Sequence, residues 1–151
     1  MTKTFISSSS AETKKFAERL ARRLVRAKSP RRHALVVALS GDLGSGKTTF
    51  VQGFFRGLGI KKRVTSPTFI IMRRSNIPHQ TPRFRNAYHV DAYRVRKSKE
   101  LSQLGFKEIL KNPENIVLIE WAERVRPLLH RRAQFVVLSH EKKENVRHIS
   151  L

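Results

Sequence analysis

The stretch that decides the fold is Gly41-Asp42-Leu43-Gly44-Ser45-Gly46-Lys47-Thr48-Thr49, which fits the phosphate-loop pattern G-x-x-x-x-G-K-[ST]. Residues 34–39, just before it, form a continuous apolar run that indicates a buried parallel strand. After it, Phe50, Phe54 and Leu58 recur four positions apart, which predicts a helix over residues 49–58. Strand, glycine-rich loop and helix therefore follow one another in the order that phosphate binding requires.

The residue types in this loop suit phosphate chemistry. Glycines let the backbone turn tightly, so that successive N–H groups can point at phosphate oxygens without a Cβ in the way. The helix that follows adds its unpaired N–H groups and the positive end of its dipole. Lys47 would place a compact charge on the outer phosphates, and the Thr48 hydroxyl is the expected Mg²⁺ ligand. The alternative is a glycine-rich turn that fits the pattern by chance, but the flanking strand and helix favour nucleotide binding.

The length and composition set broad limits. The 151 residues predict one domain, residues 1–151, with a sizeable core. The sequence has no cysteine, which excludes disulfides and thiolate metal sites and fits a reducing cytoplasm. No apolar run approaches the length of a membrane span, and residues 1–7 lack the apolar core of a secretory signal. We therefore expect a cytoplasmic protein with no membrane association.

The charge is the unusual feature of the composition. The chain has 32 Lys and Arg against 11 Asp and Glu, a net charge of +21. Such a surface attracts polyanions, so direct RNA or DNA contact is one hypothesis. The alternatives are a basic drift of the source proteome and a solvated face with no partner. The basic run at residues 28–32 leaves the same choice between an RNA-facing edge and a solvated connection, and the solvated connection is favoured.

Local patterns predict the other regular elements. Ser9 and Glu12 form a capping-box pattern that opens a helix, whose apolar stripe contains Phe16, Leu20 and Leu24. Short helical turns are expected on either side of Gly105. Strands are expected at residues 5–6, 69–72, 86–94 and 116–121, and a β-hairpin from residues 134–138 and 146–149. Residues 73–85 read as a hairpin connection or a mobile loop.

Two acidic residues end predicted strands. In open α/β sheets ligands bind beyond the carboxyl ends of the strands, which is where Asp91 and Glu120 stand. A carboxylate at this place supports the magnesium ion in phosphate-loop NTPases. The alternative is that each acid only pairs with a neighbouring basic side chain, and we favour the functional reading for both. Trp121, next to Glu120, either walls the nucleotide pocket or fills the core.

A second hydroxyl-rich segment follows the predicted phosphate-loop helix. Thr65-Ser66-Pro67-Thr68 places three hydroxyl residues around a proline, which keeps Ser66 extended. This segment could form a loop that senses the third phosphate of a nucleotide, and it could equally be an ordinary turn. The residues alone do not choose between these two interpretations.

Taken in order, these pieces resemble the TsaE family, the small ATPases of bacterial tRNA threonylcarbamoyladenosine (t6A) biosynthesis. The resemblance runs from about Ser10 to the end of the chain, so it covers nearly the whole sequence. It rests on five segments, whose combination is far more specific than a phosphate loop alone. They are residues 41–50 (GDLGSGKTTF), 65–69 (TSPTF), 89–94 (HVDAYR), 104–108 (LGFKE) and 119–123 (IEWAE).

The resemblance implies a fold, a site and partners. The fold would be a phosphate-loop NTPase-like α/β fold, with a mostly parallel sheet flanked by helices. ATP would bind across Asp42, Leu43, Gly44, Ser45, Gly46, Lys47, Thr48 and Thr49, with contacts from Thr65, Ser66, Thr68 and Trp121. Thr48 and Glu120 would hold Mg²⁺, and Asp91 would position or activate the attacking water. The partners would be the TsaD and TsaB proteins, whose complex the ATPase would reset or remodel.

The sequence departs from the family pattern in three respects. Ala92 replaces a more frequent leucine and Ala122 a common proline, and neither change touches the chemistry. The basic excess is larger than expected, which raises the possibility of direct tRNA contact, with residues 73–85 as the first place to look. Two other functions stay open: a phosphate-loop small-molecule kinase and an RNA-binding protein that ATP switches.

Overall fold

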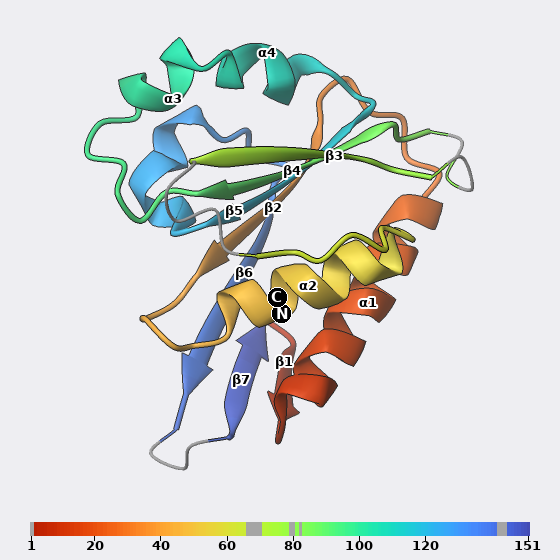
Figure 1. The fold of residues 1–151 in the computed structure, drawn as a ribbon, viewed down its shortest axis with the longest axis vertical. Helices are drawn as coiled ribbons and strands as arrows, with labels where there is room; N and C mark the ends of the chain where they lie inside the picture. The colour runs from red at the N-terminus through yellow and green to blue at the C-terminus, as the bar shows by residue number, and fades with distance from the viewer. Residues whose placement is uncertain (1, 66–70, 79–80, 82, 142–144) are drawn as a thin grey trace.

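The structure is a computed structural model that describes residues 2–65, 71–78, 81, 83–141 and 145–151. Within these residues the chain forms a seven-stranded sheet with the strand order β1-β7-β6-β2-β5-β4-β3 (Figure 1). The elements in chain order are β1 (Thr4–Ser7), α1 (Ser10–Arg26), β2 (Leu35–Ser40), α2 (Lys47–Gly57), β3 (Met72–Asn76), β4 (Asn86–Asp91), α3 (Lys99–Gln103), α4 (Phe106–Lys111), β5 (Asn115–Glu120), the 3₁₀-helix η1 (Ala122–Leu128), β6 (Gln134–His140) and β7 (Arg147–Ser150).

The sheet is parallel at its centre and antiparallel at both edges. Strands β6, β2, β5 and β4 run parallel to one another, whereas β3 pairs antiparallel with β4. The predicted C-terminal hairpin is confirmed, because β6 and β7 pair antiparallel. Strand β1 adds to the outer side of β7, which brings the two ends of the chain together (Figure 1). The predicted α/β fold is confirmed, and its sheet is mixed.

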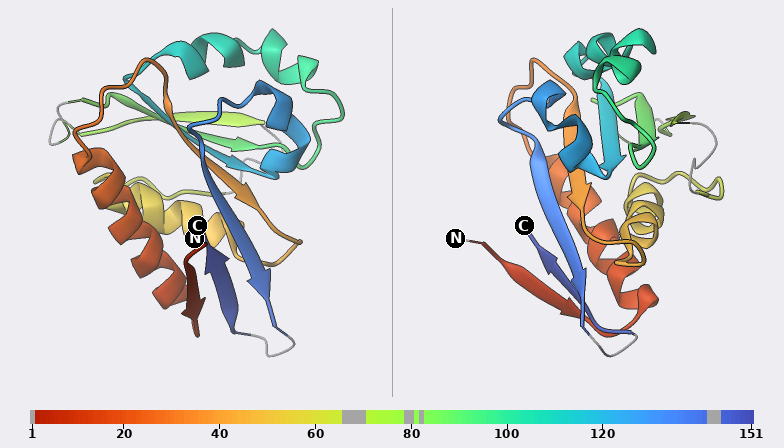
Figure 2. Two further views of the ribbon diagram at one scale, coloured as in Figure 1. Left: turned by 180° about the vertical axis from the view of Figure 1, so that it is seen from behind. Right: turned by 90° about the vertical axis from the view of Figure 1, so that its left-hand side faces the viewer.

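Helices cover both faces of this sheet, and the central strands supply a core to each face (Figure 2). Along β2, Leu35, Val37 and Leu39 pack in the core under α1 and α2. The alternate residues Val36 and Ala38 pack in the second core, under α3, α4 and η1. A strand that alternates between two buried faces has no solvent side, which explains the continuous apolar run in the sequence. None of the described helices is long and apolar enough to cross a membrane.

Of the two hydrogen bonds predicted for the N-terminal cap of α1, one is confirmed and the other has a different donor. Ser9 Oγ accepts a hydrogen bond from the Glu12 amide at 3.1 Å, as the pattern predicts. The Glu12 carboxylate, however, accepts from the Ser8 amide at 2.7 Å, one residue earlier than in a capping box. Both bonds satisfy amides near the start of the helix, so the cap still fixes where α1 begins.

Helices α1 and α2 pack closely because a glycine stands at their contact. A Cβ at Gly53 would lie 2.3 Å from the Lys14 carbonyl oxygen, which is backbone and cannot move without shifting α1. Gly53 therefore allows α1 to pack closely against α2, although glycine disfavours helix formation.

We predict that Gly53→Ala lowers the free energy of unfolding by about 1–3 kcal/mol, because overpacking outweighs the gain in helix propensity. Urea unfolding followed by circular dichroism measures the change. Arg23→Ala, on the exposed face of α1, is the control and should change stability by less than about 0.5 kcal/mol. A Gly53→Ala protein as stable as the parent would contradict the close packing.

The sequence predicts a hairpin connection or a mobile loop at residues 73–85, but its first residues belong to the sheet. Strand β3 runs to Asn76, so Arg73 and Arg74 belong to the sheet and not to a loop. Polar residues are tolerated there because β3 is an edge strand, and Arg74 donates to the Asn86 side-chain oxygen at 2.7 Å. The strand predicted at residues 69–72 is seen only at Met72, since residues 66–70 lie outside the described part of the chain.

Candidate functional site

The phosphate loop connects β2 to α2, as the sequence predicts. Gly41 has φ +148°, and a Cβ there would lie 2.2 Å from the Leu138 carbonyl oxygen on β6. A side chain is therefore excluded by both the conformation and the neighbouring strand. The loop ends at Gly46, whose carbonyl accepts from the Phe50 amide at 2.9 Å and so begins the hydrogen bonding of α2.

Lys47 is buried and held by the loop itself. Its ammonium donates to the carbonyl oxygens of Gly41 and Asp42 at 2.5 and 2.9 Å, and to Ser45 Oγ at 3.3 Å. Burial lowers the pKa of Lys47, and nearby carboxylates, chiefly Glu120, oppose this shift. Since an ammonium has three protons, a phosphate oxygen would have to replace one of these three acceptors.

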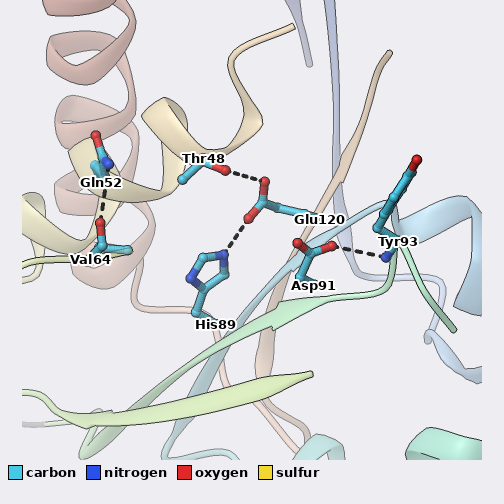
Figure 3. Close-up of polar contacts among 7 residues, drawn as sticks. All are labelled: Thr48, Gln52, Val64, His89, Asp91, Tyr93 and Glu120. Carbon is cyan, nitrogen blue, oxygen red and sulfur yellow. Dashed lines mark hydrogen bonds and ion pairs between the residues drawn. The ribbon is translucent and has the colours of Figure 1, made fainter. Parts of the chain in front are cut away.

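Glu120 links the phosphate loop to the neighbouring strand. Its Oε1 accepts from the Thr48 hydroxyl at 2.8 Å, and its Oε2 lies 2.5 Å from His89 Nε2 (Figure 3). Glu120 and His89 are only 3% and 2% exposed, so the carboxylate is fixed from both sides in a buried position. A buried carboxylate needs such partners, and together they hold its Oε1 beside the Thr48 hydroxyl.

Asp91 lies next to Glu120 because the two strands are in register. The two residues are direct partners in the parallel pairing of β4 with β5. Asp91 Oδ1 accepts from the Tyr93 amide at 3.0 Å, which stabilises the turn at the end of β4 (Figure 3). Unlike Glu120, Asp91 is partly exposed and lines the cavity in front of the phosphate loop. The two acids therefore occupy adjacent places with different solvent access.

A cavity of about 430 Å³ brings most of the predicted site residues together. Of the residues predicted from the sequence, it is lined by Leu43, Gly44, Gly46, Lys47, Thr48, Thr49, Asp91, Glu120 and Trp121. Ser45 and Asp42 do not line it, but both contact the Lys47 ammonium. Thr65 is exposed, accepts from Arg73 at 3.4 Å and does not line the cavity. Ser66, Pro67 and Thr68 lie outside the described residues.

Trp121 forms one wall of the cavity. The Lys47 ammonium lies 4.1 Å from its ring centroid, and the Tyr93 ring lies 5.0 Å away. Its φ of +59° is unusual for a residue with a Cβ. This backbone conformation directly after β5 places the residue in the lining of the cavity, while part of its side chain also packs against the second core. Of the two interpretations of Trp121, the geometry favours the wall of the pocket.

Further residues of the cavity were not predicted as site residues. The additional lining comes from Ser10, Thr13, Tyr93, Asn145 and Arg147. Ser10 and Thr13 belong to the start of α1, whereas Asn145 and Arg147 belong to the C-terminal hairpin. No local pattern marks these four residues, because they reach the phosphate loop only through the pairing of β6, β7 and β1 beside it. Tyr93 follows β4 and belongs to the motif at residues 89–94, although it was not predicted as a site residue. His89 had two usable signals: it opens the motif at residues 89–94, and it lies two residues before Asp91 and therefore on the same face of its strand.

The fold and this site define a phosphate-loop NTPase-like α/β protein. The family model "Threonylcarbamoyl adenosine biosynthesis protein TsaE" matches residues 7–149. The chain therefore belongs to the TsaE family, as its sequence motifs predict.

Individual relatives agree with this assignment. The Rickettsia prowazekii tRNA threonylcarbamoyladenosine biosynthesis protein TsaE is 38% identical over 80% of this chain and 75% of its own length. The Bacillus subtilis protein of the same name is 40% identical over 68% of this chain and 60% of its own length. The crystal structure of Bacillus subtilis YdiB covers 99% of this chain and 84% of its own, with a TM-score of 0.73 and 28% identity.

Proposed function

We propose that this chain is a Mg²⁺-dependent ATPase subunit of the t6A modification machinery, which hydrolyses ATP to reset or remodel a TsaD–TsaB complex. The observation that carries the proposal is the meeting of Lys47, Thr48, Asp91 and Glu120 in one cavity at the phosphate loop. Family membership supports the pathway, because the relatives' names place them in tRNA threonylcarbamoyladenosine biosynthesis.

The arrangement supports different roles for Lys47, Asp91 and Glu120. Lys47 and the amides at the start of α2 would bind the β- and γ-phosphates and stabilise the charge that develops on them. Asp91 faces the cavity with solvent access, which suits a group that positions a water molecule. Glu120 is fixed behind the loop by Thr48 and His89, which suits a structural role toward a metal ion.

The residues fit a magnesium ion. Mg²⁺ prefers hard oxygen ligands at about 2.0–2.1 Å in an octahedron, so adjacent ligand atoms lie about 2.9 Å apart. Thr48 Oγ1 and Glu120 Oε1 are separated by 2.8 Å, which matches two adjacent positions. Bound there, Mg²⁺ would supply charge neutralisation for the β- and γ-phosphate oxygens. Thr48 would have to release its hydrogen bond to Glu120, and His89 would keep the carboxylate oriented meanwhile.

The reaction is the transfer of the γ-phosphoryl group of ATP to water. A bond forms between the water oxygen and the γ-phosphorus, the bond to the β–γ bridging oxygen breaks, and ADP leaves with that electron pair. The proton lost by the water would pass to Asp91 and then to solvent. Most of the rate enhancement would come from positioning and electrostatic stabilisation, since the protein forms no covalent bond to the phosphoryl group.

The proposal is tested by ATP hydrolysis of the purified chain, first alone and then with TsaB and TsaD from the same source. We expect weak activity alone and at least tenfold stimulation by the pair, because a partner would complete the open site or order a loop near it. A phosphate-release assay measures both rates, and TsaB alone serves as the control.

Three outcomes would count against parts of this proposal. Strong turnover that the pair leaves unchanged would overturn the partner-gated mechanism. Nucleotide consumption that needs an added metabolite would favour a small-molecule kinase. ATP binding without any hydrolysis, combined with ATP-dependent RNA binding, would favour an ATP-switched RNA-binding protein.

A further inference from the structure

One face of α1 is strongly basic, and we call it the α1 basic face. It consists of the exposed residues Lys15, Arg19, Arg22, Arg23 and Arg26. At 3.6 residues per turn these five positions fall within about 100° of the helix circumference, and at 1.5 Å per residue they extend over about 16 Å. The four arginines also line one surface hollow of about 570 Å³. The face lies opposite Ala17, Leu20 and Ala21, which are buried in the core.

Little of this charge is compensated. Glu18, at the edge of the face, accepts from Arg22 at 2.6 Å and from Arg56 of α2 at 2.9 Å. The other acid of α1, Glu12, accepts from the Ser8 amide at the start of the helix. The other four basic side chains of the face form no ion pair within the described part of the chain. Like charges four residues apart on a helix repel one another, so an anion that lies along this face would stabilise α1.

Arg83 adds a fixed guanidinium at the C-terminal end of α1. It donates to the carbonyl oxygens of Ala27 and Ser29, at 2.9 and 2.8 Å, although it belongs to the segment before β4. The connection at residues 28–32 was predicted to be simply solvated, but Arg31 is partly buried. Burial lowers the pKa of Arg31, and the neighbouring Arg83 and Arg132 lower it further. Positive charge therefore continues past the end of the helix.

The length and chemistry of the α1 basic face discriminate among anionic partners. A line of charges about 16 Å long is longer than a small anion and matches a polymer of regularly spaced phosphates. A helix that lies on a membrane inserts apolar side chains, and protein interfaces are centred on large anchoring residues. The exposed large apolar residues of the described chain lie outside α1, at Ile6, Leu43, Tyr93, Leu104 and Val137. A nucleic acid backbone is therefore the partner that fits this face.

We propose that the α1 basic face binds the phosphate backbone of a duplex nucleic acid without reading its sequence. Single strands bind by stacking their bases on aromatic side chains, whereas Phe16, the aromatic residue of α1, stacks on Phe5 and packs against the core. Contacts to phosphates position a protein on a duplex and carry no sequence information. Residues 73–85, the first place that the sequence suggests, fit less well, because Arg74 donates to Asn86 in the sheet.

This proposal does not depend on the ATPase function. If the phosphate loop failed to hydrolyse ATP, the α1 basic face would still bind a duplex, and the reverse also holds. Helix α1 reaches the phosphate-loop cavity only with Ser10 and Thr13 among its described residues, and Arg19 lies about 9 Å farther along the helix. Variants at Arg19 and Arg23 should therefore leave ATP binding unchanged.

The test is fluorescence anisotropy with short labelled RNA and DNA duplexes of one sequence, over a range of salt concentrations. Arg19→Ala combined with Arg23→Ala should weaken binding about 10- to 60-fold at about 0.1 M salt, since each phosphate contact contributes up to about eightfold through counterion release. On the DNA duplex, the slope of log K against log salt should become shallower by about 0.9 for each lost contact. The two duplexes should bind within about threefold of each other, and the single strands should bind more weakly.

Two control variants separate a defined surface from the effect of net charge. Lys107→Ala combined with Lys111→Ala removes the same charge from exposed positions of α4, which covers the other face of the sheet (Figure 2). Salt screens charges at that separation, so we expect this control to weaken binding by less than about threefold. Arg19→Lys combined with Arg23→Lys keeps the charge and should bind within about threefold of the parent. Circular dichroism and ATP binding check that every variant is folded.

Several results would overturn the proposal. One is an equal loss in the α4 variant and in the alanine variant of α1, and another is tighter binding of single strands than of duplexes. Competition by inorganic phosphate as effective as that by unlabelled duplex would make the face a small-anion site. Binding to phosphatidylserine vesicles that the alanine variant of α1 loses to the same extent would assign the face to a membrane surface.

Discussion

Lys47→Ala is expected to lower ATP hydrolysis by about 10²- to 10³-fold, the usual loss when one preorganised charge-stabilising group is removed. The lysine is the buried cation at the phosphate loop, and no other described residue lies in its place among the loop carbonyls. Nucleotide affinity should fall as well, because the ammonium would contact the phosphates already in the bound state. A phosphate-release assay and equilibrium binding of a fluorescent ATP analogue measure the two effects separately.

A stability measurement accompanies this variant. Removing Lys47 takes the ammonium donor from the Gly41 carbonyl oxygen and one of two donors from the Asp42 carbonyl oxygen, which still accepts from the Ser45 amide, so part of the loss could come from a loosened loop. Thermal unfolding without nucleotide shows whether the domain stays folded, and Lys61→Ala, an exposed lysine beyond α2, is the matched control. Hydrolysis at the parental rate in a folded Lys47→Ala protein would refute the proposed site.

Asp91→Asn is expected to spare ATP binding and to lower hydrolysis by about 10²- to 10⁴-fold, the range attributed to general base catalysis. Asparagine has nearly the same shape, and its side-chain oxygen can still accept the Tyr93 amide, so the turn at the end of β4 should persist. The variant therefore removes the charge and the proton acceptor while keeping the geometry. Single-turnover hydrolysis at saturating ATP isolates the chemical step from binding.

Glu120→Gln is the matched comparison, because it makes the same chemical change on the neighbouring strand. Here we expect the concentration of Mg²⁺ needed for half-maximal activity to rise, since the proposed mechanism assigns this carboxylate, held beside Thr48, to the metal ion and not to the water. Raising Mg²⁺ should rescue part of the activity in Glu120→Gln and none in Asp91→Asn. If Asp91→Asn bound ATP poorly and hydrolysed normally what it bound, the roles assigned to the two acids would be wrong.

The sequence alone predicted the features that depend on local chemistry. The phosphate loop was recognisable because glycines, lysine and threonine must stand at fixed spacing between a strand and a helix. The buried strands were recognisable because β2 and β5 are covered on both faces and so read as continuous apolar runs. The placement of Asp91 and Glu120 at the ends of β4 and β5 followed from chain direction, since parallel strands all point their carboxyl ends at one edge of the sheet.

The order of the strands in the sheet determined the contacts between residues that are distant in sequence. Thr48 and Glu120 are 72 residues apart in sequence, and they meet because β2 and β5 are neighbours in the sheet. Arg147 reaches the same cavity only because β7 folds back on β6, and Arg31, Arg83 and Arg132 gather only because the loops before β2, β4 and β6 open at one end. Which strands become neighbours depends on the apolar side-chain area that is buried over whole faces of the sheet. No short stretch of sequence contains that sum, so these contacts could not be predicted locally.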